Sequence, residues 1–199
     1  MRGPQLAGIV VSDNAEDWEA VGFQVNNGLV SIGTLTVAVN RPVTEPQWWF
    51  EPQVTSSIHG IGHADPSPRS ALAVKNTNGA NAVDHIVVIT PNLATTTAEF
   101  EEHGFELRRS RPRQDQEQRF FWAGTTIIEV VGPAVAESAG PAHIWGLALV
   151  SDDLDASKEL LGDRMSDPKE AVQPGRRIAA IRTAQHKISV TIALMSPHH

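Results

Sequence analysis

The chain has 199 residues and a hydrophobic fraction of 41%, which fits one large domain or two small ones. Its formal net charge of −7 argues against nucleic-acid binding, since that normally needs a basic surface. Cysteine is absent, which excludes disulfides, thiolate metal sites and cysteine nucleophiles. No run reaches the roughly 18 apolar residues of a membrane span, and the N-terminus lacks a signal-peptide pattern, so we expect a cytoplasmic protein without membrane contacts.

The first predicted unit is a strand, a short helix and three further strands. Residues 6–13 (LAGIVVSD) form the strand, residues 14–22 (NAEDWEAVG) form a helix of barely two turns, and the remaining strands lie at 23–26, 29–33 and 34–39. Residues 41–80 do not repeat this order, although QWWFEPQV and SSIHGIGH are typical of short strands, and the Ala-, Asn-, Pro-, Gly- and Ser-rich stretch after them is typical of a linker. We therefore expect a degenerate N-terminal βαβββ-like module over 1–56 and a linker over 57–81.

The same order of elements occurs twice more. Residues 83–90 (VDHIVVIT) predict a strand, Asn92 lies where a helix N-cap would precede 93–104, and three strands follow at 105–112, 118–124 and 125–133. Residues 145–152 predict the next strand, 153–162 a helix capped by Asp152 or Asp153, and 171–184 and 188–196 further strands. We expect these two copies, 82–133 and 142–196, to pair within 82–199. The first module then lacks a partner, so we expect it to form a homodimer or to cap the pair through QWWFEPQV.

This pattern resembles the vicinal-oxygen-chelate superfamily, which includes glyoxalase I, bleomycin- and fosfomycin-resistance proteins and extradiol dioxygenases. The resemblance is carried by DHIVVITPNLATTTAEFEEHGFELRR, FFWAGTTIIEVVGP and WGLALVSDDLDASKELLG, while AVQPGRRIAAIR with SVTIALMSP resembles the closing strands of uncharacterised glyoxalase-like proteins. It is good over 82–196 and weak over 6–40. It implies an α+β fold of repeated βαβββ modules that form a U-shaped mixed sheet, with the helices outside and a trough that can hold a divalent metal.

The same resemblance places half of a metal site in the middle copy. Metal-dependent members take a His or Gln from the first strand of a module and a Glu from its last strand, which corresponds to His85 and Glu129 here. The matching positions of the third copy are Gly146 and Ala193. Two protein ligands hold an octahedral ion weakly, so we expect a His–Glu contact and no cofactor. The alternative is a Zn, Ni, Mn or Fe ion with further ligands from another chain or module.

Several side chains suit a ligand in the trough. Arg176 and Arg177 begin a strand and should point to opposite faces, so that one reaches inward, where a guanidinium group suits a carboxylate or phosphate. We assign ligand contacts to Arg176, Arg119, Phe121, Trp122 and Trp145, with core packing as the alternative for the aromatic residues.

Three functions fit these features, and no catalytic residue is assigned. The first is metal-free binding of a small, partly apolar molecule in the trough of the module pair. The second is a metal-dependent lyase or isomerase of the glyoxalase I type that uses His85 and Glu129. The third is a structural or regulatory module whose trough is filled by its own side chains. Gly146 and Ala193 favour the first function over the second.

Overall fold

The computed structural model describes residues 3–54, 56–65 and 75–197, which form two β-sheets and three α-helices. The N-terminal part holds β1 (Gln5–Val10), α1 (Ala15–Glu19), β2 (Val25–Asn26), β3 (Leu29–Ile32), β4 (Leu35–Ala38) and β5 (Gln47–Glu51). The middle copy holds β6 (Ala80–Ile89), α2 (Leu93–Glu102), β7 (Glu106–Arg113), β8 (Gln116–Ala123) and β9 (Thr126–Pro133). The last copy holds β10 (His143–Ser151), α3 (Leu154–Leu161), β11 (Lys169–Glu170), β12 (Arg177–Ile181) and β13 (Thr191–Met195), with 3-10 turns at Gly162–Arg164 and Thr183–His186.

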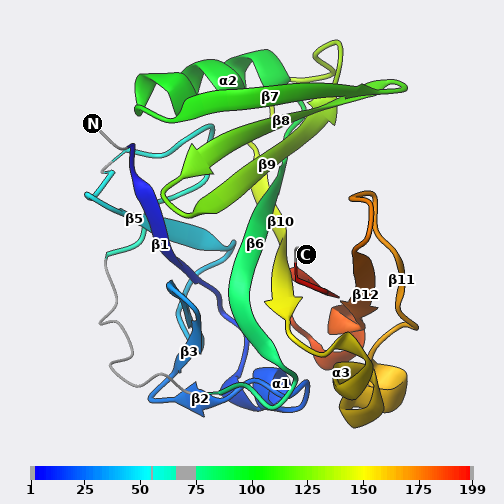
Figure 1. The fold of residues 1–199 in the computed structure, drawn as a ribbon. Coiled ribbons are helices and arrows are strands. Elements are labelled where there is room, and N and C mark those ends of the chain that lie inside the picture. Colours follow the sequence, from blue (N-terminus) through cyan, green and yellow to red (C-terminus); the bar gives the residue numbers. More distant parts are fainter. Residues whose placement is uncertain (1–2, 55, 66–74, 198–199) are drawn as a thin grey trace.

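The middle and last copies share one eight-stranded sheet in the order β11-β12-β13-β10-β6-β9-β8-β7 (Figure 1). Within each copy the first strand runs parallel to the last, β6 with β9 and β10 with β13. The two first strands pair antiparallel and join the copies. This is the predicted α+β architecture of paired βαβββ modules, and the sheet bends into a U that opens to the right of β6 and β10 in Figure 1.

Residues at the helix starts follow the expected capping rules. The side chain of Asn92 accepts a hydrogen bond from the Thr95 amide, and that of Asp153 accepts one from the Ala156 amide, which satisfies a free N–H at the start of α2 and of α3. None of the helices in the described ranges is long and apolar enough to cross a membrane.

The N-terminal sheet, ordered β2-β3-β4-β1-β5, repeats the same topology with one addition. Strand β1 is parallel to β4, and β5 pairs antiparallel with β1 just as β10 pairs with β6. Strand β5 therefore takes the place of a partner module's first strand, a role that we did not predict for residues 41–80. The partner's place beside β1 is therefore filled within the chain.

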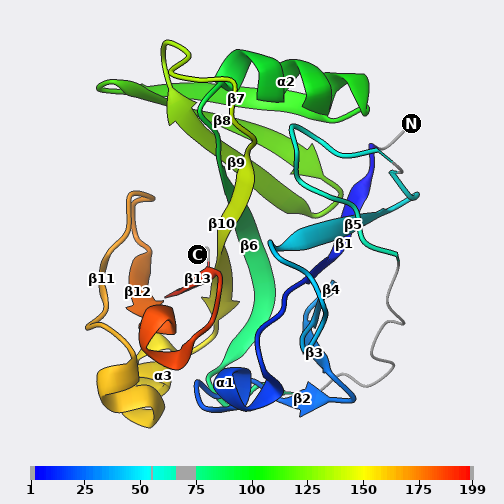
Figure 2. The same ribbon diagram turned by 180° about the vertical axis from the view of Figure 1, so that it is seen from behind.

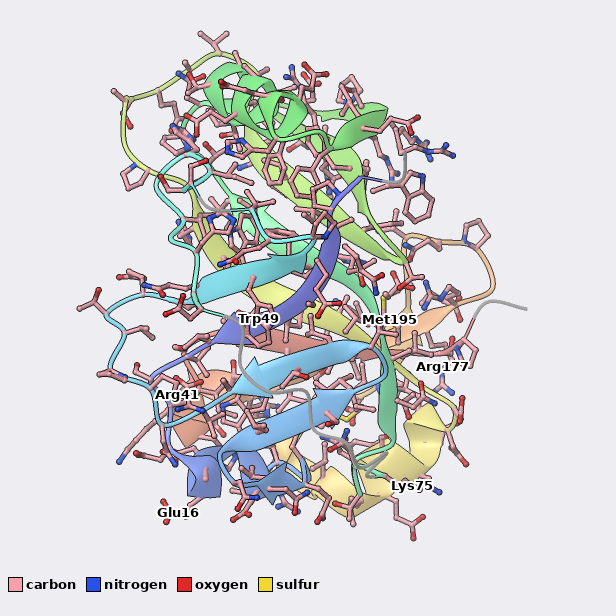
Figure 3. The ribbon with its side chains drawn as sticks, turned by 90° about the vertical axis from the view of Figure 1, so that its left-hand side faces the viewer. Glu16, Arg41, Trp49, Lys75, Arg177 and Met195 are labelled. Atoms are coloured by element: carbon pink, nitrogen blue, oxygen red, sulfur yellow. The ribbon has the colours of Figure 1, made fainter. Side chains whose placement is uncertain are left out.

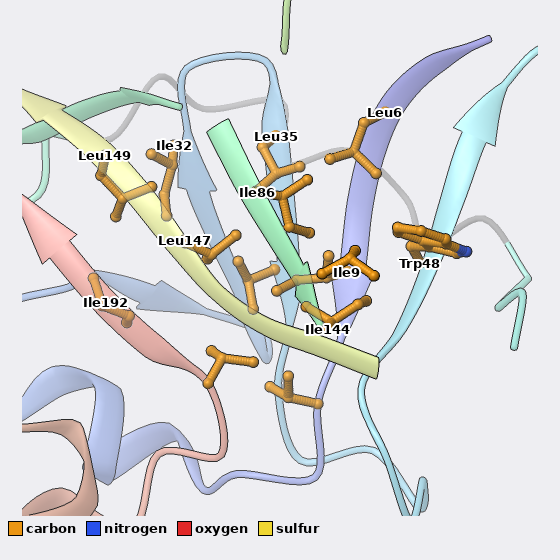
Figure 4. Close-up of a cluster of buried hydrophobic side chains, with 14 of the residues drawn as sticks. Leu6, Ile9, Ile32, Leu35, Trp48, Ile86, Ile144, Leu147, Leu149 and Ile192 are labelled. Atoms are coloured by element: carbon orange, nitrogen blue, oxygen red, sulfur yellow. The ribbon is translucent and has the colours of Figure 1, made fainter. Parts of the chain in front are cut away.

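The hydrophobic core lies between the two sheets (Figure 2). Leu6 and Ile9 of β1 share one face because the strand has a register shift after Leu6. They face Ile86 of β6 and Leu147 of β10, and all four side chains are buried (Figure 4). The segment expected to be a linker contributes to this core, since Ile58 and Ile61 are buried and β6 already begins at Ala80.

One histidine is part of this core. The ring of His63 packs beside Trp48 and Phe50, and both of its ring nitrogens are buried without a hydrogen-bond partner among the described residues. Burial, reinforced by the charge of His103, lowers the pKa of His63 to about 4. The neutral form of this side chain is therefore the one that the folded protein accommodates.

The outer face of the N-terminal sheet is closed by its own side chains. Figure 3 looks onto this sheet and labels Trp49, which is buried with Ala7, Val10 and Ala38 on the face turned away from the main core. A Cβ atom at Gly8 would lie 2.0 Å from the Trp49 ring, so only glycine lets the indole cross this strand. The N-terminal unit is thus filled where the module pair is open.

Candidate ligand-binding trough

The trough is the face of the eight-stranded sheet that points away from the N-terminal sheet. Strand register decides which side chains line it, because successive residues of a strand alternate between the faces. On β6, Ile86 and Val88 are buried in the core, so His85 and Val87 face the trough. Glu129 of β9 lies beside Val87 and therefore shares this face.

His85 and Glu129 meet in the middle of the trough. Nε2 of His85 lies 3.4 Å from Oε2 of Glu129, and the side-chain amide of Gln118 donates a 2.6 Å hydrogen bond to Oε1. Burial raises the pKa of Glu129, although the nearby positive charges of His85, Arg113 and Arg111 oppose the rise. The structure thus brings together the two residues that the sequence places on the first and last strands.

Asp84, which we did not single out from the sequence, orients His85. Its Oδ1 lies 2.7 Å from Nδ1 of His85, and because a carboxylate only accepts, the Nδ1–H group is the donor, which turns Nε2 toward Glu129. Burial raises the pKa of Asp84, but the hydrogen bonds from His85 and Arg176 outweigh this and hold it at about 2. A β-bulge lies here, since His85 and Val83 pair with the consecutive residues Ala148 and Leu149.

Arg176, which we assigned to ligand contact, is buried and binds other residues of the protein. Its Nη1 donates to Oδ2 of Asp84 at 2.7 Å, its Nε donates to the Ser196 carbonyl at 2.8 Å, and only 2% of the side chain is exposed. Arg177 points the other way and pairs with Asp155 on the surface. The predicted opposition of the two arginines is therefore present, but the inward one holds Asp84 in place and is too buried to meet a ligand directly.

Two further assignments require correction, because they picked the wrong face of β8. Phe121 pairs with Ile128, is fully buried and stacks on Phe100 of α2 with ring centroids 4.8 Å apart. Arg119 lies on the same face and donates to Thr97 of α2 at 2.7 Å. Phe120, which lies opposite Glu129, is the aromatic residue that faces the trough.

The two tryptophans differ in position. Trp145 is 45% exposed and lies at the apolar end of the trough, where it lines a hollow with Val87 and Ile178. Trp122 is 37% exposed and has the Arg108 guanidinium 5.3 Å from its ring centroid. Trp145 can therefore contact a molecule in the trough, whereas Trp122 already has a cationic partner.

Comparison with known proteins agrees with this architecture. No protein-family model and no curated protein matches the sequence, but solved structures match the fold. A halotolerant catechol dioxygenase is similar over 99% of this chain and 87% of its own, at 12% identity and a TM-score of 0.58. A variant of homoprotocatechuate 2,3-dioxygenase from B. fuscum is similar over 99% and 73%, at 11% identity and a TM-score of 0.55. The chain has the vicinal-oxygen-chelate fold.

Methylmalonyl-CoA epimerase from Mycobacterium tuberculosis is also similar, over 61% of this chain and 91% of its own, at 19% identity and a TM-score of 0.48. At these identities the likeness to solved structures concerns the fold and not the reaction. The function of this chain therefore has to be argued from the side chains in its own trough.

A metal in a vicinal-oxygen-chelate trough would need donors from both modules, and the last copy offers none at the matching positions. On β9, Glu129 is two residues after Ile127, the neighbour of His85, and on β13, Ala193 is two residues after Thr191, the neighbour of Gly146. A Cβ at Gly146 would lie 2.5 Å from the Thr191 carbonyl oxygen, so no larger residue fits without moving β13.

The potential metal ligands elsewhere in the described ranges do not replace the missing ones. The described residues contain no group of three or more His, Cys, Asp or Glu side chains placed to hold a metal ion. His85 and Glu129 alone leave most of the coordination sphere of an octahedral ion to water. The residues present here therefore do not fit the divalent metal of metal-dependent members.

Three adjoining hollows make up the trough, and they change in character along it. The central one, of about 360 Å³, is lined by His85 and Glu129. It shares His85, Lys169 and Ile178 with an apolar hollow of about 410 Å³ at Trp145. On its other side it shares Arg111, Phe120 and Gln173 with a hollow of about 340 Å³ beside β7. A single elongated molecule can thus contact all three.

Proposed function

We propose that this protein is a glyoxalase-like binding protein that takes a small, partly apolar molecule into the trough of its module pair without a resident metal. The observation that carries the proposal is the open trough whose matching metal positions are Gly146 and Ala193, with no space for a ligating side chain at Gly146. The N-terminal unit supports the same proposal by contrast, because Trp49 fills its corresponding face.

The apolar end of the trough is suited to burying part of a ligand. Val87, Ile178 and Ala193 line it, and the large indole of Trp145 stands exposed at its side. Ligand sites combine such apolar walls with a few convergent polar groups, here His85 and Glu129. Burying the exposed part of Trp145 under a ligand would stabilise the complex through the hydrophobic effect.

The test is binding of N-phenyl-1-naphthylamine, an uncharged dye that fluoresces in apolar surroundings. Ala193 faces the trough from β13, so Ala193→Phe should fill the apolar hollow and abolish saturable dye binding. Ala136→Phe is the matched control, because Ala136 is exposed in the loop before β10, and it should bind as the wild type does. Equal binding by both variants, or no saturable binding by the wild type, would overturn the proposal.

A second candidate, a metal-dependent lyase or isomerase of the glyoxalase I type, is favoured by one observation. The His85 and Glu129 side chains approach within 3.4 Å and both border the central hollow. This function requires additional ligands from another chain. It predicts that untagged protein carries stoichiometric Ni, Zn or Mn, and that Glu129→Ala loses it.

A further inference from the structure

Strand β7 presents a row of arginines to the trough. Arg109, Arg111 and Arg113 occupy alternate positions and pair with Phe120, Gln118 and Gln116 of β8, in that order. Phe120 and Gln118 border the central hollow, so the three arginines belong to the same face. All three side chains are exposed.

These charges have no close carboxylate partner in the described parts of the chain, although Arg111 and Arg113 lower the pKa of Glu129 without forming an ion pair with it. Arg119, on the other face of the same hairpin, pairs with Glu117 at 2.9 Å, but Arg109, Arg111 and Arg113 make no ion pair with any described residue. The hollow beside β7 is lined by Arg108, Arg109 and Arg111, with Phe120, Ile127 and Gln173, and by no carboxylate. Such a concentration of positive charge is unexpected in a chain of net charge −7.

An alternative explanation is that the arginines protect an exposed sheet edge, since β7 is the outer strand and edge strands are often charged. Edge protection does not require the charges to share one face. It also does not account for a cationic hollow that adjoins the central hollow of the trough, which in turn adjoins the apolar one. Lys169, from β11 on the far side of the trough, lines the adjoining central hollow together with Arg111 and Arg113. Glu129 and Glu170 also line that central hollow, so the unbalanced charge is at the β7 end.

We propose that the ligand carries an oxyanion group, held by Arg109 and Arg111, and that its apolar body extends past His85 and Glu129 toward Trp145. This inference rests on the proposed function and specifies its ligand class: a carboxylate, phosphate or sulfonate joined to a hydrophobic group. The planar guanidinium group matches an oxyanion through paired hydrogen bonds, and two arginines two residues apart on one strand face can hold the same group.

The experiment compares two dyes of the same skeleton. 1-Anilinonaphthalene-8-sulfonate differs from N-phenyl-1-naphthylamine by one sulfonate, so the ratio of their affinities isolates the anion. We expect the sulfonate dye to bind about tenfold more tightly at low salt, in the range of a charge-assisted hydrogen bond. High salt should remove most of this preference, because exposed charges are screened.

The decisive variant is Arg109→Gln/Arg111→Gln, with Arg41→Gln as control, since Arg41 is exposed on the N-terminal part of the chain. The double variant should lose the preference for the sulfonate dye and keep its affinity for the uncharged one, whereas the control should keep both. An unchanged preference in the double variant, or no preference in the wild type while the uncharged dye binds, overturns this inference alone. Failure of both dyes to bind overturns the proposed function as well.

Competition identifies the oxyanion. Displacement of the sulfonate dye by phenyl phosphate at lower concentration than by benzoate assigns a phosphate group to the ligand, and the reverse order assigns a carboxylate. Displacement by neither compound contradicts the inference, because both carry the required anion on an apolar ring.

Discussion

Two neighbouring arginines provide a controlled test of how the trough is built. Arg176 is 2% exposed and pairs with Asp84, whereas Arg177 pairs with Asp155 on the surface. Asp84→Ala would leave the Arg176 guanidinium buried without its carboxylate partner. Removing one partner of a buried pair typically lowers the free energy of unfolding by about 3–5 kcal/mol. For a chain of this length that corresponds to a fall in Tm of about 10 °C.

The assay is urea and thermal denaturation of Asp84→Ala and of Asp155→Ala. Asp155→Ala is the matched control, because the same substitution removes an aspartate from an exposed ion pair. Asp155→Ala should change stability within the error of the measurement, because solvent screens exposed pairs. The double variant Asp84→Ala/Arg176→Met should recover most of the lost stability, since it removes the buried charge as well. The reasoning is refuted if Asp84→Ala is no more harmful than Asp155→Ala, or if the double variant is the least stable.

Three further predictions concern the core and the face assignments. Because the pKa of His63 is lowered to about 4, the unfolded state binds a proton at this residue at higher pH than the folded state does. The free energy of unfolding should therefore decrease as the pH falls from about 6.5 to 4. His63→Gln should weaken this pH dependence in denaturation curves measured at pH 7 and pH 5. Gly146→Ala should destabilise by about 1–3 kcal/mol through overpacking, while Gly140→Ala, whose new Cβ meets only ordinary contacts, should be neutral in the same assay. Phe121→Ala should cost about 3–5 kcal/mol, whereas Phe120→Ala should cost less and weaken dye binding; the reverse order would contradict the assignment of faces.

Features that depend on local patterns could be predicted from the sequence. The alternation along VDHIVVIT and TTIIEVV places His85 and Glu129 on the trough face, and Asn92 and Asp153 mark the helix starts because short polar side chains satisfy free amides there. The module order follows from the repetition of these patterns. Comparison with solved structures confirms the resulting fold.

Features that depend on pairing between strands could not be predicted in the same way. Phe120 and Phe121 are chemically identical neighbours, and only the register with Glu129 decides which one faces the trough. Asp84 is adjacent to His85, so simple alternation assigns it to the opposite face, and the bulge against β10 changes this. The adjacent polar residues Asp84 and His85 in an otherwise apolar strand were the one signal that could have indicated an irregularity.

The role of β5 was missed for a related reason. QWWFE is a single strand separated from its module by irregular chain, and it is recognised as a partner strand only through its pairing with β1. Likewise, the arginines of β7 look like a solvated charge run in sequence, because their common face becomes visible only when the register with β8 is known.

The most direct test of metal-free binding in the trough is the affinity of untagged protein for N-phenyl-1-naphthylamine before and after dialysis against a strong chelator, with metal content measured on both samples. Our account predicts the same affinity in both samples and far less than one metal ion per chain in either. Stoichiometric metal in the first sample, lost on dialysis together with dye binding and lost also in Glu129→Ala, would contradict it.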